Sequence, residues 1–220
     1  MIATPPLDLP AFVPADRRYT VAEWLAIEEA TGERYEYHAG KLVSARAMAG
    51  GSPEHALPIG NASFLAGGIV RELEREGLRG TRCSVYSSDL KLAVLSEERY
   101  VYPDLAIVCG KPVFDEAVPT AVVNPVAVFE VLSPSSRDYD EGEKFRHDGA
   151  LATLRDYVLV RQRERRVDLY TRPSADEEWS VTVHTRAGDA FALGGLGGLP
   201  IGLDDLYRDW EAPAARGRRS

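Results

Sequence analysis

The sequence predicts an α/β fold in which helices flank a mixed β-sheet. Segments with apolar residues at helical spacing occur in the first half of the chain, around a short alternating segment. Three runs rich in β-branched and aromatic residues then follow one another without a helix between them. A further helical segment and a final set of strands complete the pattern. This order is typical of a sheet with helices packed against it.

The length and composition indicate an ordinary globular protein. The chain has 220 residues, of which 45% are hydrophobic and 27% are charged, and one domain of this length can bury a sizeable core. We expect a proline-restricted leader over residues 1–17, a single domain over 18–211 and a basic tail over 212–220. No apolar run has the length of a membrane span, and no secretory signal is recognisable.

The charge and the cysteines limit the partners and the compartment. The net charge of -8 should repel polyanions, which counts against nucleic-acid binding unless basic side chains gather on one face. Cys83 and Cys109 form no C-x-x-C motif and are too few for a disulfide scaffold. We therefore expect reduced thiols and a cytoplasmic location.

The N-terminal half should contain two helices around a hairpin. Thr20 with Glu23 three residues later is a capping box, and Gly32 is suited to end the helix that it begins. The alternating segment after this helix turns at Ala39 and Gly40, which predicts a β-hairpin. A longer helix should then extend to Gly77, because apolar residues recur in it at helical spacing.

The C-terminal half should supply most of the sheet. Three strand-like runs are separated by turn-forming residues, and we expect them to form the centre of one sheet. A helical pattern then precedes two strands joined by an arginine-rich turn and one further strand. In chain order, these runs are residues 81–95, 99–110 and 124–133, the helix 138–154, the paired strands 156–173 and the last strand 179–186.

Two acidic residues interrupt strands that otherwise look fully buried. Glu130 lies in "VAVFEVLS", where both alternating sets of positions are apolar, and Asp104 interrupts the apolar run "YVYPDLAIVCG" just after Pro103. A desolvated carboxylate needs a cation, hydrogen bonds or a metal ion. A structural ion pair is the ordinary explanation. The alternative is that both carboxylates converge on one divalent cation.

Lys144 is a candidate cation for the same place. It lies in the helical segment after Glu130, on a stripe with His147, Leu151 and Leu154 that should face the sheet. Mg²⁺ is usually bound by one or two carboxylates together with waters and substrate phosphates. A lysine beside such an ion could assist the chemistry, although an i,i+4 ion pair with a helix neighbour is equally ordinary.

The motifs together resemble a known family. The segments "RYEYHAGKLV", "SPEHALPIGN", "YPDLAIV", "NPVAVFEVLSPSSRDYDEGEKFRH" and "LRDYVLV" are similar to the Uma-type (Uma-two) family of restriction endonucleases, within the PD-(D/E)XK nuclease-like superfamily. The resemblance covers roughly residues 19–171. It implies a restriction-endonuclease-like fold.

The resemblance also assigns roles to individual residues. Asp104 matches the acidic residue of the "PD" element, Glu130 the second acidic residue and Glu36 the early glutamate of the family. Leu132 occupies the position of the lysine in E-x-K, so Lys144 would be the migrated lysine. The chain departs from the family at a further position, Asp148, where tyrosine is usual.

By this resemblance the protein would be an endodeoxyribonuclease that uses Mg²⁺ or Mn²⁺. Asp104 and Glu130 would hold the metal, which activates a water near neutral pH. Lys144 would orient that water, and Glu36 would complete the metal shell or hold Lys144. The implied partner is DNA, and apolar edges and the family's habits imply a homodimer, which light scattering can test. The rival is a catalytically inactive nucleic-acid- or protein-binding module on the same fold.

Three further residues are candidates for contacts with substrate phosphates. His55 lies at the start of the second helix, and Arg161 and Arg163 belong to the arginine-rich turn. A helix-start histidine and a charged hairpin tip are also common structural features. Serine chemistry is disfavoured, because the serines after Glu130 lie outside any G-x-S-x-G elbow.

Overall fold

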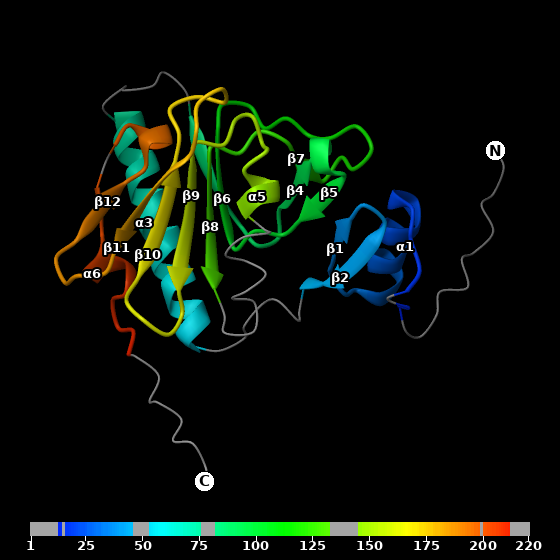
Figure 1. Ribbon diagram of the computed structural model, residues 1–220, viewed down its shortest axis with the longest axis horizontal. Coiled ribbons are helices and arrows are strands. Elements are labelled where there is room, and N and C mark those ends of the chain that lie inside the picture. The colour runs from blue at the N-terminus through cyan, green and yellow to red at the C-terminus, as the bar shows by residue number, and fades with distance from the viewer. Residues whose placement is uncertain are drawn as a thin grey trace, which may run out of the picture.

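The predicted α/β fold is confirmed by a computed structural model of the chain. It describes residues 13–14, 16–45, 53–75, 82–132, 145–198 and 200–211, and of 53–55 and 72–74 only the backbone. Two large sheets with flanking helices make up this part of the chain (Figure 1). The expected leader and tail lie mostly outside it.

The first helix and the hairpin form as predicted. Helix α1 spans Val21–Thr31, with a complete capping box between Thr20 and Glu23 and a left-handed Gly32 at its end. The hairpin turns at Ala39 and Gly40, whose φ angles are 46° and 91°. A two-residue turn with both φ angles positive has the twist that antiparallel strands require.

A five-stranded sheet is built around this hairpin. Its order is β2-β1-β5-β4-β7, and only the β4·β7 pair is parallel. A short 3-10 helix, η1, spans Leu95–Glu97 between two of its strands. The strands are β1 Tyr35–His38, β2 Lys41–Ser44, β4 Lys91–Val94, β5 Arg99–Val101 and β7 Ala121–Val122.

A six-stranded mixed sheet forms the centre of the molecule. Its order is β11-β10-β9-β8-β6-β3, and the β8·β9 pair is parallel while its other pairs are antiparallel. The paired strands around the arginine-rich turn and the strand after them are therefore confirmed. The strands are β3 Cys83–Ser87, β6 Leu105–Cys109, β8 Ala127–Leu132, β9 Asp156–Arg161, β10 Val167–Thr171 and β11 Ser180–His184.

The expectation that three consecutive runs form one sheet is wrong. The run 81–95 divides into β3 and β4, and the run 99–110 divides into β5 and β6, with one strand of each pair in each sheet. A turn at residues 88–90 separates the first pair. At the second break Pro103 has no N–H to donate to a ladder, so pairing with the five-stranded sheet stops before Asp104.

The described layers pack in the order helices, sheet, sheet, helix. Helix α3, Pro53–Arg75, and the short α6, Leu203–Leu206, share one core with one face of the six-stranded sheet. The five-stranded sheet shares a second core with the opposite face, and α1 covers the outer side of the five-stranded sheet (Figure 1). A small hairpin of β12, Ala190–Ala192, and β13, Pro200–Gly202, flanks η3, Gly194–Leu196. No helix in the described ranges is long and apolar enough to cross a membrane.

The helix expected over residues 138–154 is much shorter where it is described. Helix α5 spans only Phe145–Asp148, and turns follow it. Leu151 and Leu154 are buried as predicted, but from these turns. Asp148 is 1% exposed and accepts a hydrogen bond from the Tyr157 hydroxyl at 3.2 Å, so this departure from the family has a packing role. Residues 133–144 lie outside the described part.

The expectation of two reduced thiols is contradicted. Cys83 on β3 and Cys109 on β6 are directly opposite one another in the antiparallel ladder and form a disulfide. Their separation of 26 positions in the chain concealed this pairing, because only the strand register brings them together. The bond ties the edge strand β3 to the strand that begins beside Asp104.

We expect reduction of this disulfide to lower the free energy of unfolding by about 3 kcal/mol, the loop-closure value for a loop of this length. Urea unfolding with and without reductant measures the change. The double variant Cys83→Ser, Cys109→Ser is the matched control, because its stability should not respond to reductant. Alkylation of both cysteines in the untreated native protein would contradict the bond.

Candidate active site

Asp104 and Glu130 face the region between the two sheets, which we call the gap and in which apolar side chains of both sheets pack. Along β8, Val128 and Leu132 pack in the core between the sheets, and Glu130 lies between them on the same face. Along β6, Ala106 and Val108 pack in that same core. Asp104 lies two residues before Ala106, so its side chain points to the same face. The two carboxylates therefore share one face of the six-stranded sheet.

The strand register also brings Asp104 next to Glu130. Leu105 is paired with Phe129, so continuing the antiparallel ladder by one residue sets Asp104 opposite Glu130. The carboxylate of Asp104 reaches this position, because its Oδ2 accepts a hydrogen bond of 2.7 Å from the backbone N–H of Val131. Glu130 is 5% exposed and Asp104 is half-buried. One carboxylate thus lies deep in the gap and the other at its edge.

Glu36 faces the gap from the five-stranded sheet. Its neighbours Tyr35 and Tyr37 pack against α1 on the outer side, so Glu36 points the other way. It is 1% exposed, and its Oε1 accepts a hydrogen bond from the N–H of Tyr102 at 3.3 Å. Tyr102 lies two positions before Asp104. The early glutamate therefore contacts the segment that carries the "PD" aspartate.

His38 and Arg99 extend this polar group, and the sequence analysis did not identify them as site residues. They are paired between β1 and β5, and Nη2 of Arg99 lies 3.1 Å from the ring nitrogens of His38. His38 Nε2 also lies 2.9 Å from Glu36 Oε2. The alternation in "YEYH" sets Glu36 and His38 on one face and was the available signal. Arg99 carried no such signal, because its partner is 61 positions away.

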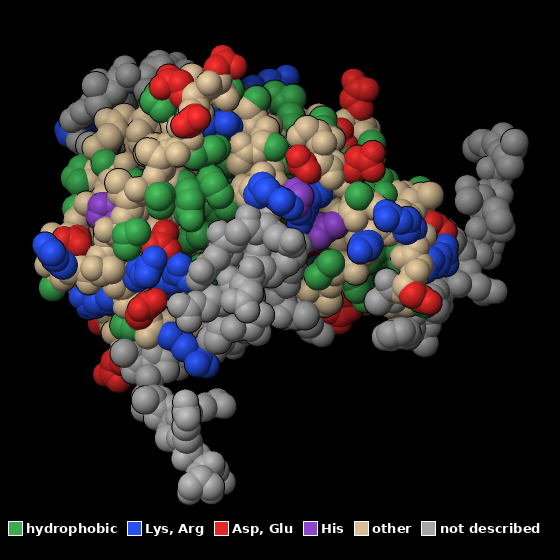
Figure 2. All heavy atoms as spheres, in the orientation of Figure 1, with side chains coloured by type: hydrophobic (Ala, Val, Ile, Leu, Met, Phe, Trp, Pro, Cys, Tyr) green, Lys and Arg blue, Asp and Glu red, His purple; other side chains and the backbone are tan. Residues whose placement is uncertain are grey.

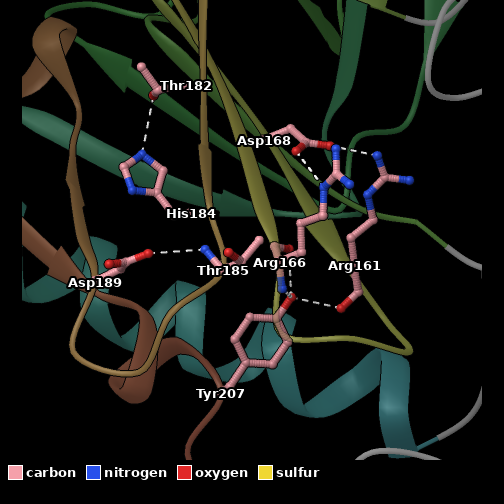
Figure 3. A network of polar contacts seen from close by, with 8 residues as sticks. All are labelled: Arg161, Arg166, Asp168, Thr182, His184, Thr185, Asp189 and Tyr207. Atoms are coloured by element: carbon pink, nitrogen blue, oxygen red, sulfur yellow. Dashed lines mark hydrogen bonds and ion pairs between the residues drawn. The ribbon is translucent and has the colours of Figure 1, made fainter.

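Arg161 lies on the same face of the six-stranded sheet, at the end of β9. Its side chain points to the same face of β9 as those of Tyr157 and Leu159, which pack in the core between the sheets. Its guanidinium donates to Asp168 at 2.5 Å, and Arg166 donates to the same carboxylate at 2.8 Å (Figure 3). Tyr207 donates to the carbonyl of Arg161 at 2.7 Å. Arg161 is thus a buried, anchored cation.

The three remaining predicted residues are either exposed or not fully described by the structure. Arg163 is exposed at the tip of the β9–β10 turn. His55 belongs to the first turns of α3, and its side chain is not described. Lys144 falls outside the described residues, next to the first residue of α5. The structure therefore sets Asp104 beside the strand of Glu130, with Glu36 in contact with the segment before Asp104 and Arg161 farther along the face that carries Glu130.

Figure 2 shows basic and histidine side chains gathered at the seam between the part that carries β1 and β2 and the part that carries α5. One contact at this seam is known in detail: His147 Nδ1 on α5 lies 2.9 Å from Glu97 Oε2 on η1. The side chain of Tyr102 is fixed against α1, since its hydroxyl donates to Glu28 at 2.9 Å. Burial, followed by the Glu28 carboxylate, raises the pKa of Tyr102, so this phenol stays neutral.

The donor chemistry of the gap suits a hard divalent cation bound in part by the protein. Asp104 and Glu130 supply oxygen ligands from neighbouring strands, and Mg²⁺ needs only one or two carboxylates when waters and phosphates complete its shell. The ranges that the structure describes contain no group of three or more His, Cys, Asp or Glu side chains arranged to hold a metal.

Comparison with known proteins identifies the relatives of this chain. A family model described as "Putative restriction endonuclease", Uma2, matches residues 21–201. Uncharacterized protein slr1290 of Synechocystis sp. is 32% identical over 84% of this chain and 90% of its own length. Uncharacterized protein sll1609 of the same organism is 30% identical over 74% of this chain and 85% of its own length.

A solved structure shares the fold. It is titled as the crystal structure of a "putative nuclease belonging to DUF820" from Anabaena variabilis. The match has a TM-score of 0.64, covers 86% of this chain and 97% of the other, and has 15% sequence identity. At this identity the likeness concerns the architecture alone. It shows that the two-sheet arrangement also occurs in a crystal structure.

The hydrogen bond from the N–H of Val131 to Asp104 should contribute to the stability of the fold. Asp104→Ala leaves a buried N–H without its acceptor and should lower the free energy of unfolding by about 1–3 kcal/mol. Asp104→Asn keeps an acceptor oxygen of the same shape, so its cost should be under about 1 kcal/mol. Urea unfolding measures both variants. Equal costs for Ala and Asn would show that this bond does not hold the strand.

Proposed function

The chain belongs to the Uma2 family, which is described as "Putative restriction endonuclease", and on this premise we propose that it hydrolyses phosphodiester bonds of DNA with the help of Mg²⁺ or Mn²⁺. The observation that carries the proposal is the placement of Asp104 and Glu130 on one face of neighbouring strands, in the gap between the sheets. This geometry supports the roles that the family resemblance implies for these two of the 34 acidic residues.

Asp104 and Glu130 would hold the metal. When bound, the ion would polarise the scissile phosphate and lower the pKa of a coordinated water. The protein's own contribution is to fix the two carboxylates before substrate arrives. The Val131 N–H orients Asp104 by a 2.7 Å hydrogen bond, and burial in the inter-sheet core restrains Glu130. Little reorganisation would then be needed when DNA binds.

Glu36 and Lys144 would complete the site. Glu36 contacts the backbone of Tyr102, so it is positioned to hold the approach to Asp104 in place or to add a ligand through water. We propose that Lys144 reaches the gap from the segment just before α5 and orients the attacking water. His38 and Arg99 would position Glu36, since His38 lies 2.9 Å from its carboxylate.

The rival function is a binding module that has lost catalysis. One observation favours it: the net charge of -8 should repel a polyanion such as DNA. The retention of both carboxylates and a lysine in family order supports activity instead. The two functions make opposite predictions for a cleavage assay.

We expect the purified protein to nick or cleave supercoiled DNA when Mg²⁺ or Mn²⁺ is present and to stop when EDTA is added. Asp104→Asn and Glu130→Gln should each lower the rate by about 100-fold or more, because each removes charge that would stabilise the metal and the transition state. The measurement is the rate of conversion of supercoiled plasmid, with linear and single-stranded DNA as further substrates.

The control for these variants is Glu29→Gln, which removes one negative charge from the exposed side of α1. It should cleave at the native rate. If Asp104→Asn, folded as judged by circular dichroism, cleaves as fast as the native protein, the activity belongs to a contaminant. DNA binding without cleavage by any preparation would select the binding module.

DNA binding requires basic side chains that are not already neutralised. Arg161 and Arg166 share Asp168, and Arg165 pairs with Asp204. Arg163 is exposed at the tip of the same turn and makes no hydrogen bond or ion pair within the described part of the chain. We propose that Arg163 contacts a phosphate of the DNA backbone.

Replacing Arg163 by Gln should weaken DNA binding and reduce the slope of log affinity against log salt by about 1. Arg165→Gln removes the same charge from the same turn, but its slope should change less because Asp204 already neutralises Arg165. Fluorescence anisotropy with a duplex over a range of salt concentrations measures both slopes. Identical slopes for the native protein and Arg163→Gln would exclude this contact.

A further inference from the structure

Strands β6 and β8 carry Asp104 and Glu130 near one end, and a pocket opens at their other end. It has a volume of about 690 Å³, and its lining includes Val126, Arg155 and Arg172. Val126 precedes β8 by one residue and lies four positions before Glu130, which is about 13 Å along an extended strand. Val126 also belongs to the core on the α3 side of the six-stranded sheet. The pocket is therefore separate from the gap between the sheets.

Two arginines line this pocket, and backbone carbonyls hold the guanidinium group of each. Nη1 of Arg155 donates to the carbonyls of Ala152 and Leu154, both at 2.9 Å. Arg172 donates to the carbonyl of Leu154 from Nε at 3.0 Å, to that of Leu151 from Nη2 at 2.6 Å and to that of Ala175 from Nη1 at 3.4 Å. Its guanidinium also stacks over the ring of Trp179 at 4.4 Å, so Arg172 contributes buried positive charge beside the pocket. These bonds fix the orientation of both side chains without neutralising their charge.

Neither cation forms an ion pair in the described part of the chain, and no acidic residue lines the pocket. The two arginines are close, because the N–H of Arg172 donates to the carbonyl of Arg155 at 3.0 Å. Burial and then the charge of Arg155 lower the pKa of Arg172, while Asp176 acts in the opposite direction. Arg155 is only half-buried, and its Nε and Nη2 donate to no described partner.

The hydroxyl groups of the pocket are oriented to accept hydrogen bonds. Thr153 donates its proton to the carbonyl of Pro125 at 2.8 Å, and Ser180 donates to the carbonyl of Thr171 at 3.2 Å. Thr171 donates to Asp156 Oδ1 at 3.0 Å. A hydroxyl whose proton is used in this way can still accept. A ligand would therefore offer hydroxyl or amino donors to these oxygens, besides an anionic group for the arginines.

The wall beside the arginines is rigid. Asp156 is fully buried and accepts hydrogen bonds from the N–H groups of Gly194 at 3.0 Å and Gly195 at 2.7 Å. A Cβ on Gly195 would lie 2.6 Å from Asp156 Oδ2 and 2.8 Å from Arg155 Cβ, so only glycine fits there. The glycine-rich segment thus packs directly against the arginine, and the pocket is formed before any ligand arrives.

We propose that this pocket binds a phosphorylated small molecule of about mononucleotide size. A phosphate monoester carries close to two negative charges near neutral pH. Arg155 would donate to it from Nε and Nη2, and the buried charge of Arg172 would add to the attraction. Guanidinium groups are well suited to bind phosphate oxygens. Sugar hydroxyls or base amino groups would donate to the threonine and serine oxygens. The volume of about 690 Å³ lies within the range of small-molecule sites.

The test is isothermal titration calorimetry of the full chain with AMP and with inorganic phosphate as probes. AMP should bind with one site per chain, and inorganic phosphate should compete with it. Arg155→Gln should weaken AMP binding by about 10-fold or more, the expected loss for a charge-assisted hydrogen bond. Ser180→Trp should also abolish binding, because it fills the pocket from the exposed start of β11 without changing the charge.

Arg186→Gln is the matched control, because it removes one exposed positive charge outside the pocket and should bind AMP as the native protein does. Thermal melts will verify that each variant is folded. Absence of AMP binding, or unchanged binding in folded Arg155→Gln and Ser180→Trp, overturns the proposal. Displacement of AMP by a single-stranded oligonucleotide without terminal phosphates would also overturn it, since the site would then recognise phosphodiesters.

Discussion

The packing of the five-stranded sheet on the six-stranded sheet is the interaction on which the rest of the structure depends. Leu92, Val101 and Val122 from one sheet and Val128 and Leu159 from the other bury one apolar core. Burial of these side chains is the main favourable contribution to folding. The same contact keeps water away from the polar residues at its edge. Glu36 and Glu130 are nearly fully buried because each sheet covers the other.

This arrangement explains why so many ionisable groups occur in one region. A buried carboxylate is tolerated only when hydrogen bonds, a cation or a metal compensate for its lost hydration. Asp104 has the Val131 N–H, Glu36 has the Tyr102 N–H and His38, and Asp168 has two arginines. The polar groups around this core are thus held in place by hydrogen bonds and ion pairs.

The two proposed sites lie at opposite ends of the same strands. Strand β8 carries Glu130 near one end and begins beside the pocket residue Val126, and β6 begins after Asp104 and ends at Cys109 on the pocket. The disulfide to Cys83 joins β6 to the edge strand at the pocket end. Both sites therefore depend on one set of rigid central strands, although one faces the second sheet and the other faces the glycine-rich segment.

Local patterns in the sequence were sufficient for the features that depend on neighbouring residues. The capping box at Thr20, the turn at Ala39 and Gly40 and the hairpin around the arginine-rich turn all formed as predicted, because each depends on side chains a few positions apart. The two acidic residues were also conspicuous within apolar runs. Their identification as a pair drew in addition on the resemblance to the family.

Features that depend on strand register and on the contact between sheets could be seen only in the tertiary structure. The division of each strand run between two sheets, the bond between Cys83 and Cys109 and the pairing of His38 with Arg99 join residues far apart in sequence. No local pattern encodes such partners, because alternation tells which face a side chain occupies but not which strand lies beside it. The amino-acid order thus specifies the pieces and their faces. Burial of those faces against one another specifies the neighbours, and with them the sites.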